Sequence, residues 1–267
     1  MNALSPRRAR AANGIAVVIA ALLMWPSPAL AQLKVLISGG FTTAYKQLLP
    51  EFERTTGINV TTGSGSSQGM GPQTIGAQLA RGVPADVVIL SREGLNELIA
   101  ANRIAAGTDV DLARTPLGVA VRAGAPKPDV STVDAFKRAM MNAKAVAVPG
   151  STSGIYLTTD LFPRLGIAEK VNVKVTPRGT GATDMVAAGD ADIAVMPVSE
   201  LLRAAGVDFA GPIPAEIQLV QAFAAAVVAG SKELEASKRL IEFLASERAS
   251  GAIKNSGMEP LGKRQPD

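Results

Sequence analysis

Apolar positions along the chain alternate between short continuous runs and stretches with helical spacing. Residues 34–37 form an apolar run typical of a buried strand, and residues 41–52 place large apolar side chains on one helical face. Gly57 predicts the end of that helix, and Pro50 is expected to kink it or to start a new turn. The other elements expected in this half are strands at 58–60 and 85–90 and a helix at 73–81. This alternation predicts an α/β fold with a mostly parallel sheet.

The second half of the chain repeats the scheme. It contains apolar runs that predict strands at 145–148, 171–175 and 191–196, and helical stretches at 155–165 and 182–188. In addition, residues 83–89 and 189–195 share an Ala-Asp pair followed at once by a strand. We therefore expect two similar lobes rather than the alternative, a single α/β domain.

Two apolar stretches are expected to cross between the lobes. Residues 117–121 follow Pro116, and residues 220–228 follow a proline-rich segment. A helix at 234–245 would then complete the first lobe. The division predicted from these positions is a leader at 1–31, a first lobe at 32–116 plus 223–267, and a second lobe at 117–222.

The N-terminus has the pattern of a secretory signal peptide. Three arginines and no acidic residue precede an apolar run of eleven residues, 14–24, and Ala29-Leu30-Ala31 stands before Gln32. The alternative is a membrane anchor, but eleven residues span only about 16 Å as a helix, roughly half a bilayer core. We therefore expect cleavage near Ala31 and a soluble mature protein in the periplasm. No Cys stands at the cleavage site, so a lipid anchor there is excluded.

Cleavage changes the charge of the protein. The whole chain has 27 basic and 23 acidic residues; without the three leader arginines the difference is 24 minus 23, or +1. No basic run follows Gln32, so the electrostatic pattern of a nucleic-acid-binding protein is missing. Aromatic residues make up only 4% of the chain. Nucleic acids and large sugars, which stack on aromatic side chains, are therefore poor candidates for the ligand.

The chain contains neither Cys nor His. Disulfides cannot form, and Ser-His-Asp or Cys-His catalysis is excluded. A zinc site is very unfavourable without these ligands. A Ser-Lys mechanism is not excluded. The segment 179–184 is the nearest approach to a dinucleotide-binding fingerprint, and it lacks the third glycine. We expect a protein that is not an enzyme and has no cofactor.

Four loops rich in serine and glycine follow predicted strands and precede helices. They lie at residues 38–40, 64–67, 151–154 and 178–181. Ligands of open α/β sheets bind beyond the carboxyl ends of the strands, and a helix N-terminus offers free N–H groups and a partial positive charge. Together the loops predict a cage for a small anion. The alternative for each loop is that its serines and glycines are only N-cap or turn residues.

The order and spacing of several motifs resemble the molybdate-binding proteins of ABC importers, which have the type II periplasmic binding fold. The motifs are at residues 35–42, 65–67, 82–87 and 153–156 and at Gly257, and the resemblance covers nearly all of the mature chain. It implies two lobes, each a mostly parallel sheet flanked by helices, with two crossover strands as a hinge. It also implies a receptor that delivers a small anion to an ABC permease in the inner membrane.

The same resemblance implies a ligand site. The family's first ligand serine falls on Gly40, with Ser38 or backbone N–H groups as substitutes, and its late ligand tyrosine falls on Pro197, which has no hydroxyl. Arg178 would add a fixed positive charge that suits a carboxylate or another oxyanion, and the alternative is that it is a solvated surface arginine. The predicted ligand-binding residues are Ser38, Gly40, Ser66, Ser67, Ser153, Gly154, Arg178 and Gly179.

The sequence thus predicts a monomeric periplasmic receptor for molybdate, tungstate or a similar oxyanion. A receptor of the same fold for a small organic carboxylate is the second hypothesis, because Gly40 and Pro197 depart from the molybdate pattern. A sensor or an enzyme on this fold is the third.

Overall fold

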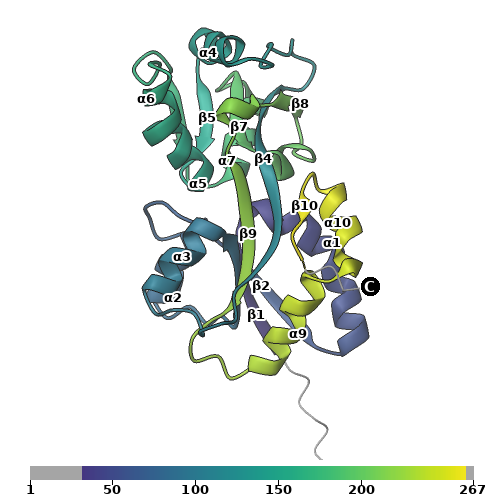
Figure 1. The fold of residues 1–267 in the computed structure, drawn as a ribbon. Coiled ribbons are helices and arrows are strands. Elements are labelled where there is room, and N and C mark those ends of the chain that lie inside the picture. Colours follow the sequence, from purple (N-terminus) through teal and green to yellow (C-terminus); the bar gives the residue numbers. More distant parts are fainter. Residues whose placement is uncertain (1–31, 263–267) are drawn as a thin grey trace, which may run out of the picture. The chain divides into compact units, whose positions relative to one another are not determined.

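The computed structural model describes residues 32–262, and the predicted signal peptide lies outside them. The first lobe is built on a sheet in which β1 pairs in parallel with both β2 and β3 (Figure 1). Its strands are β1 (Gln32–Ile37), β2 (Asn59–Ser64) and β3 (Val87–Ser91). Its helices from this part of the chain are α1 (Gly39–Thr56), α2 (Ile75–Ala80) and α3 (Arg92–Ala100).

The second lobe repeats this arrangement around a central strand, β5, which pairs in parallel with β6 and β7. Its strands are β5 (Val146–Pro149), β6 (Val173–Thr176), β7 (Ile193–Pro197) and β8 (Val207–Pro212). Its helices are α4 (Val133–Asn142), α5 (Thr152–Ile155), the π-helical segment Tyr156–Leu161, α6 (Phe162–Arg164), α7 (Gly179–Ala188) and α8 (Val198–Leu201), with a 3₁₀ turn at Ala215–Ile217.

Two long strands connect the lobes, β4 (Val110–Arg122) and β9 (Val220–Val227). Figure 1 shows them side by side between the two sheets. The first half of β4 pairs with β9, as far as Pro116 opposite Val220, and the second half pairs with β7 and β8. One continuous strand therefore belongs to both sheets.

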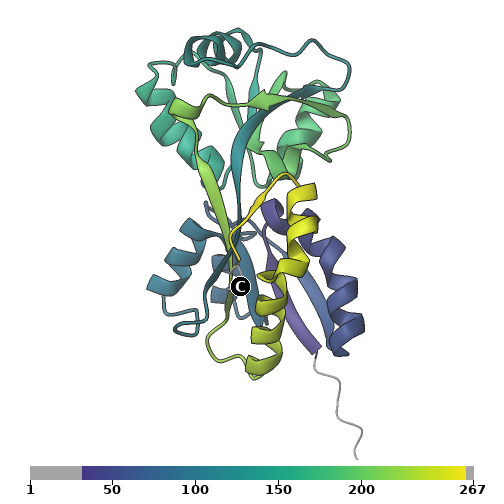
Figure 2. The same ribbon diagram turned by 45° about the vertical axis from the view of Figure 1, so that its right-hand side comes forward.

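The chain returns to the first lobe for its last elements. They are α9 (Leu234–Leu244), a 3₁₀ turn at Glu247–Ala249, α10 (Ser250–Asn255) and β10 (Glu259–Pro260), which pairs with β4. Figure 2 shows α9 and α10 on the same lobe as α1, and α9 shares a buried core with α1 through Leu240 and Phe41.

The buried apolar side chains form separate cores in the two lobes. Two clusters draw on residues 33–113 and 223–258, and two others draw on residues 117–217. Phe41 and Phe52 fill the first lobe, and Phe136 and Phe162 fill the second. The predicted runs that form β3, β5 and β7 are buried on both faces, as expected for strands covered by helices on both sides, whereas β2 and β6 are largely exposed or half-buried. The exact residues at which one lobe ends and the next begins stay a prediction.

Most of the predicted elements are present, with shifted ends. α1 ends at Gly57, whose φ of 70° is left-handed, but the helix continues through Pro50. α7 begins at Gly179, earlier than predicted, so the Gly-Thr-Gly segment is its first turn. No helix among residues 32–262 is long and apolar enough to cross a membrane.

Candidate functional site

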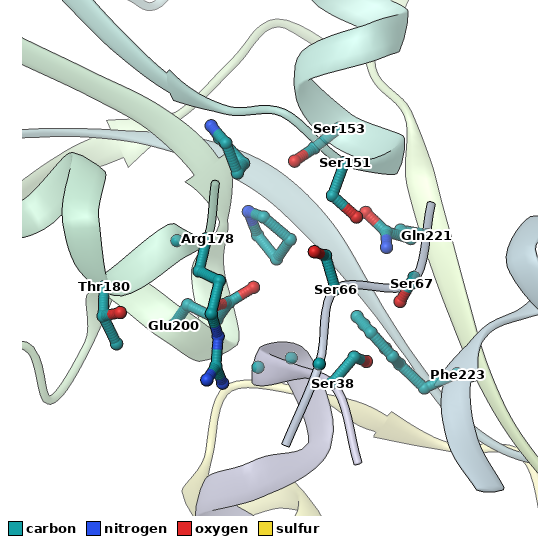
Figure 3. A pocket seen from close by; sticks show the side chains of 16 residues that line it. Ser38, Ser66, Ser67, Ser151, Ser153, Arg178, Thr180, Glu200, Gln221 and Phe223 are labelled. Atoms are coloured by element: carbon teal, nitrogen blue, oxygen red, sulfur yellow. The ribbon is translucent and has the colours of Figure 1, made fainter. Parts of the chain in front are cut away.

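A small cavity lies where the two sheets meet, and we call it the central cavity. Its volume is about 30 Å³, which is room for one or two water molecules. Both lobes contribute to its wall (Figure 3). It is lined by Ser38, Gly39, Gly40, Gly65, Ser66, Ser67, Pro149, Ser151, Ser153, Arg178, Gly179, Thr180, Pro197, Glu200, Gln221 and Phe223.

The start of α1 forms one side of the cavity. Ser38 is the N-cap residue, but its hydroxyl makes no cap bond and, although buried, has no hydrogen-bond partner among the described residues. Gly39 and Gly40 follow, and a Cβ would clash with the Glu200 carboxylate at the first and with the Phe223 ring at the second. The glycines thus bring the bare helix N-terminus, with its free N–H groups, to the cavity wall.

The start of α5 forms the opposite side. The hydroxyl group of Ser153 makes no hydrogen bond within the described residues, and the hydroxyl group of Ser151 accepts one long bond, of 3.3 Å, from the backbone N–H of Gln68. Gly154 does not line the cavity. A Cβ there would clash with the backbone carbonyl of Pro149, so this glycine is needed for α5 to pack against β5. The structure therefore shows a packing role for Gly154, and its contact with a ligand stays a prediction.

The start of α7 brings the predicted cation to the cavity. Arg178 is the N-cap residue of α7, and Gly179 is the first helical residue. The guanidinium Nη1 of Arg178 donates a 2.7 Å hydrogen bond to Ser64 Oγ in the other lobe. In Figure 3 the Arg178 side chain passes beside Glu200, and its head lies at the edge of the site.

The loop after β2 supplies the remaining predicted hydroxyls. Ser66 makes no side-chain hydrogen bond within the described residues, so its hydroxyl remains available to a ligand. Ser67 differs, because its Oγ accepts a 2.9 Å bond from the buried backbone N–H of Ser91. Seven of the eight predicted residues thus meet at one cavity, and Gly154 does not.

The helices that begin at this site have no side-chain cap, a property that they share with α6, α8, α9 and α10. α1, α5 and α7 all begin at the cavity, and none has a side-chain cap. By contrast, α2, α3 and α4 are capped by Thr74, Ser91 and Thr132. A side-chain cap would occupy the N–H groups that an anion needs, so the three uncapped ends are suited to bind one.

Glu200, at the start of α8, is a residue of the cavity that the sequence did not reveal. Its carboxylate lies against Gly39 and Gly179, at the N-termini of α1 and α7. Burial raises the pKa of Glu200 to about 7, although the positive charge of the nearby Arg178 acts in the opposite direction. Arg178 and Glu200 are the two charged residues of the described cavity wall.

Gln221 was also missed, whereas Ser151 lies in the predicted loop at 151–154 but is not among the residues predicted to bind the ligand. Gln221 lies on β9, is 3% exposed, and its Oε1 atom has no hydrogen-bond partner among residues 32–262. Its position in a crossover strand gave no signal, because an isolated glutamine between apolar residues is also found on a solvated strand face. With Ser38, it gives the cavity two buried polar atoms that a ligand would satisfy.

Hydrogen bonds join the lobes beside the cavity. The Thr152 hydroxyl lies 2.7 Å from Ser91 Oγ and donates a 2.7 Å bond to Gln68 Oε1. Together with the bond from Arg178 to Ser64, these contacts hold the lobes together on both sides of the cavity. The structure therefore represents a closed form.

A larger groove adjoins the central cavity, and we call it the side groove. Its volume is about 730 Å³, and its walls include Thr42, Lys46, Ser64 and Asp184. The groove shares Gly39, Arg178, Thr180 and Glu200 with the central cavity. Glu200 thus lines both spaces.

The described residues contain no cluster of three or more acidic, His or Cys side chains that could hold a metal ion. The donors of the central cavity are hydroxyl and backbone N–H groups, which suit an anion rather than a cation.

Comparisons with known proteins give one full-length relative. The chain is 37% identical over 253 residues to a protein from a Pseudomonas species named aconitate isomerase. The alignment covers 92% of this chain and 96% of that protein.

Solved structures resemble the fold at lower identity. The periplasmic molybdate-binding protein of Azotobacter vinelandii has a TM-score of 0.66 and 20% identity, over 88% of this chain and all of that one. The sulfate-binding protein of Mycobacterium tuberculosis has a TM-score of 0.68 and 22% identity, over 86% of this chain and 87% of that one. These likenesses confirm the predicted two-lobed type II periplasmic binding fold, and at such identity they show the fold alone.

The sequence also matches a family model. The model is described as "Bacterial extracellular solute-binding protein", and it matches residues 33–259, almost the whole of the described chain. With the two-lobed fold and the cavity between the sheets, this match places the protein in the family of bacterial extracellular solute-binding proteins.

Proposed function

We propose that this protein is a periplasmic receptor that binds a small organic polycarboxylate, of the aconitate type, in the central cavity. The observation that carries the proposal is the composition of the cavity wall. Serine hydroxyls and the N–H groups of three uncapped helix N-termini can donate hydrogen bonds to a ligand carboxylate, and Arg178 stands at the edge of the site. The name of the Pseudomonas relative supports this class of ligand.

The protonation state of Glu200 affects the binding of any anion in the central cavity. An ionised Glu200 would repel an inorganic oxyanion and a polycarboxylate alike. The pKa of Glu200, raised to about 7 by burial, allows it to be protonated near neutrality and to donate a hydrogen bond to a ligand carboxylate. Five or six bonds to a charged ligand, at about 1.5–3 kcal/mol each, are enough for micromolar binding after the cost of association.

The oxyanion receptor predicted first from the sequence is the second candidate. The unpartnered Ser38 hydroxyl and the free Ser66 hydroxyl are neutral donors of the kind that hold molybdate in the family that the sequence resembles. In either case the expected partner is an ABC permease of the inner membrane, and the protein is expected to act there as a monomer. Export with cleavage near Ala31 stays a prediction.

Isothermal titration of the purified protein separates the two candidates. The ligands are trans-aconitate, cis-aconitate and the saturated tricarballylate on one side, and molybdate, tungstate and sulfate on the other. We expect micromolar binding of the unsaturated tricarboxylates and no comparable binding of the metal oxyanions. Tighter binding of molybdate or tungstate than of every carboxylate would replace the proposal with the second candidate.

Arg178→Ala gives a sharper version of the same test. If the guanidinium leaves Ser64 to clamp a ligand carboxylate, its removal should weaken carboxylate binding by about 2 kcal/mol or more. Molybdate, held by neutral donors, should lose little. Arg138→Ala, which removes the same charge from the exposed side of α4, is the matched control and should leave both affinities unchanged.

A further inference from the structure

The position of Glu200 is unusual for a site that only binds anions. A carboxylate placed among the donors of an anion cage competes with the ligand for the same N–H groups and, when ionised, repels it. The glycines at positions 39 and 179 leave space for the Glu200 carboxylate and for no side chain of their own. The Glu200 carboxyl group therefore lies against the N-termini of α1 and α7, in the position that a bound anion would take.

The surroundings of Glu200 suit a group that gains and loses a proton. Its pKa, raised to about 7 by burial, lies where both protonation states are populated at neutral pH. No hydrogen bond to another side chain in the described region fixes either state. Because Glu200 also lines the side groove, it can exchange its proton with solvent while a ligand fills the central cavity.

We propose that Glu200 transfers a proton between two carbon atoms of an unsaturated polycarboxylate in the central cavity, so that the protein isomerises this ligand. The inference rests on the proposed function, since the ligand must first bind. It adds an activity to the receptor predicted from the sequence. The name of the Pseudomonas relative, aconitate isomerase, denotes a reaction of the same class.

The chemistry needs no group beyond the described residues. Glu200 takes a proton from the methylene carbon next to the double bond, and the C–H electron pair forms a new double bond to the central carbon. The electrons of the old double bond move to the far carbon, which receives the proton back from Glu200. One C–H bond breaks and one forms, the double bond moves by one position, and no electron is gained or lost.

The cavity wall supplies what the intermediate requires. Negative charge spreads from the carbon skeleton onto the ligand carboxylates as the proton leaves. The uncapped starts of α1 and α7 and the hydroxyl of Ser38 would stabilise this charge, because donors fixed before the reaction need no reorganisation during it. A base with a pKa near the working pH is the most effective for such a transfer.

The test follows binding and chemistry separately with trans-aconitate as the probe. Titration calorimetry measures affinity, and proton NMR in H₂O and D₂O measures conversion to the cis isomer and uptake of deuterium at carbon. The variants are Glu200→Gln, which keeps the shape without the base, and Glu216→Gln, an exposed residue of the same lobe, as the matched control. Thermal melting verifies that each variant is folded.

We expect the wild-type protein and Glu216→Gln to convert the ligand and to incorporate deuterium. Glu200→Gln should bind trans-aconitate but lose conversion by roughly 100-fold or more. The wild-type rate should rise with pH and level off above the pKa of Glu200, and Glu200→Asp should keep this profile at a lower rate.

The possible failures are distinguishable. No binding of trans-aconitate to the wild type would overturn the proposed function together with this inference. Binding without conversion or deuterium uptake would overturn the inference and leave the proposed receptor intact. Equal conversion by wild type and Glu200→Gln would overturn the assignment of Glu200.

Discussion

At the scale of single residues, the hydroxyl groups of the central cavity are not equivalent. Ser66 and Ser153 make no side-chain hydrogen bond within the described residues, so Ser66→Ala and Ser153→Ala remove a donor to the ligand and little else. We expect each change to weaken ligand binding about ten- to a hundredfold, measured by titration calorimetry. The melting temperature should stay near that of the wild type.

Ser67 serves as the contrasting variant. Because its Oγ accepts the Ser91 N–H, Ser67→Ala also leaves a buried donor unpaired, and it should lower the free energy of unfolding by about 1–3 kcal/mol. Unchanged affinity in both Ser66→Ala and Ser153→Ala would show that the ligand lies elsewhere.

Glu200 should make the stability of the protein depend on pH. Its pKa, about 7 in the folded protein, lies above the ordinary value of 4.5 that it regains on unfolding. A raised acid pKa means that the folded state holds the proton more tightly, so stability falls as pH rises from about 4.5 to about 7 and is then level. The free energy of unfolding falls by roughly 2–3 kcal/mol over this range, somewhat less than the full pKa shift would give, because the side chain is partly accessible.

Glu200→Gln should remove this dependence. Chemical denaturation of both proteins at pH 5 and pH 8 measures it, and the difference in the free energy of unfolding between the two pH values should be smaller in the variant. Equal pH dependence in the two proteins would contradict the buried position of the carboxyl group.

The sequence predicted the serines and Arg178 of the site but not Glu200. Serines and glycines that follow apolar runs mark the carboxyl ends of strands, and topology then brings those ends together. Glu200 follows β7 by one helical turn, so only the three-dimensional path of α8 turns it back toward Gly39 and Gly179. An acidic residue in such a segment is indistinguishable, in the sequence, from a solvated one.

At the scale of elements, the contact between α5 and β5 depends on Gly154. Gly154→Ala places a methyl group against the Pro149 carbonyl, where backbone must move. We expect the free energy of unfolding, measured by denaturant titration, to fall by about 1–3 kcal/mol. Because Gly154 does not line the cavity, any loss of affinity should accompany this loss of stability.

Gly251→Ala is the matched control. It lies in α10, and a Cβ there meets nothing. A glycine in a helix lowers stability relative to alanine, so this change should stabilise the protein by about 0.5–1 kcal/mol. A stable, normally melting Gly154→Ala protein would contradict the close packing of α5.

Strands were easier to predict than helix ends. The strands β3, β5 and β7 are continuous apolar runs, because both faces are covered, and their positions follow directly from the sequence. The start of α7 was placed too late, because Gly-Thr-Gly has weak helical propensity and is helical here through its position after β6. The π-helical turn at 156–161 gave no pattern of its own.

At the scale of the whole molecule, the two crossover strands predict a hinge that lies near residues 116–118 of one strand and 220–224 of the other. Gln218 joins these segments, because its side chain accepts a 2.6 Å bond from the Leu117 N–H and donates a 3.1 Å bond to the Leu117 carbonyl. The central cavity holds only one or two waters when closed, so an organic ligand requires the lobes to separate and close again.

We expect small-angle scattering to give a smaller radius of gyration with ligand than without it. Thr152→Val removes the hydroxyl that bonds Ser91 and Gln68 across the lobes and should enlarge the unliganded radius further. Thr159→Val, whose hydroxyl bonds only its own helix, is the matched control. An unchanged radius on saturation with a ligand that binds would contradict the hinge.

The shared strand β4 also restricts how the chain length of this family can vary. In the second lobe the side chains of Leu117, Val119 and Val121 pack into one core, and Ala120 packs into another on the opposite face of the strand. Gly118 lies on the same face as Ala120, where Phe209 and Val198 leave no room for a Cβ. One residue inserted where β4 passes from one lobe to the other would exchange the two faces of the strand, so that valine side chains would point toward the crowded side at Gly118. β4 already holds one extra residue opposite β9, because Asp111 and Ala113 pair with the adjacent residues Ala224 and Phe223, and a further single insertion at the crossing would need another bulge of this kind.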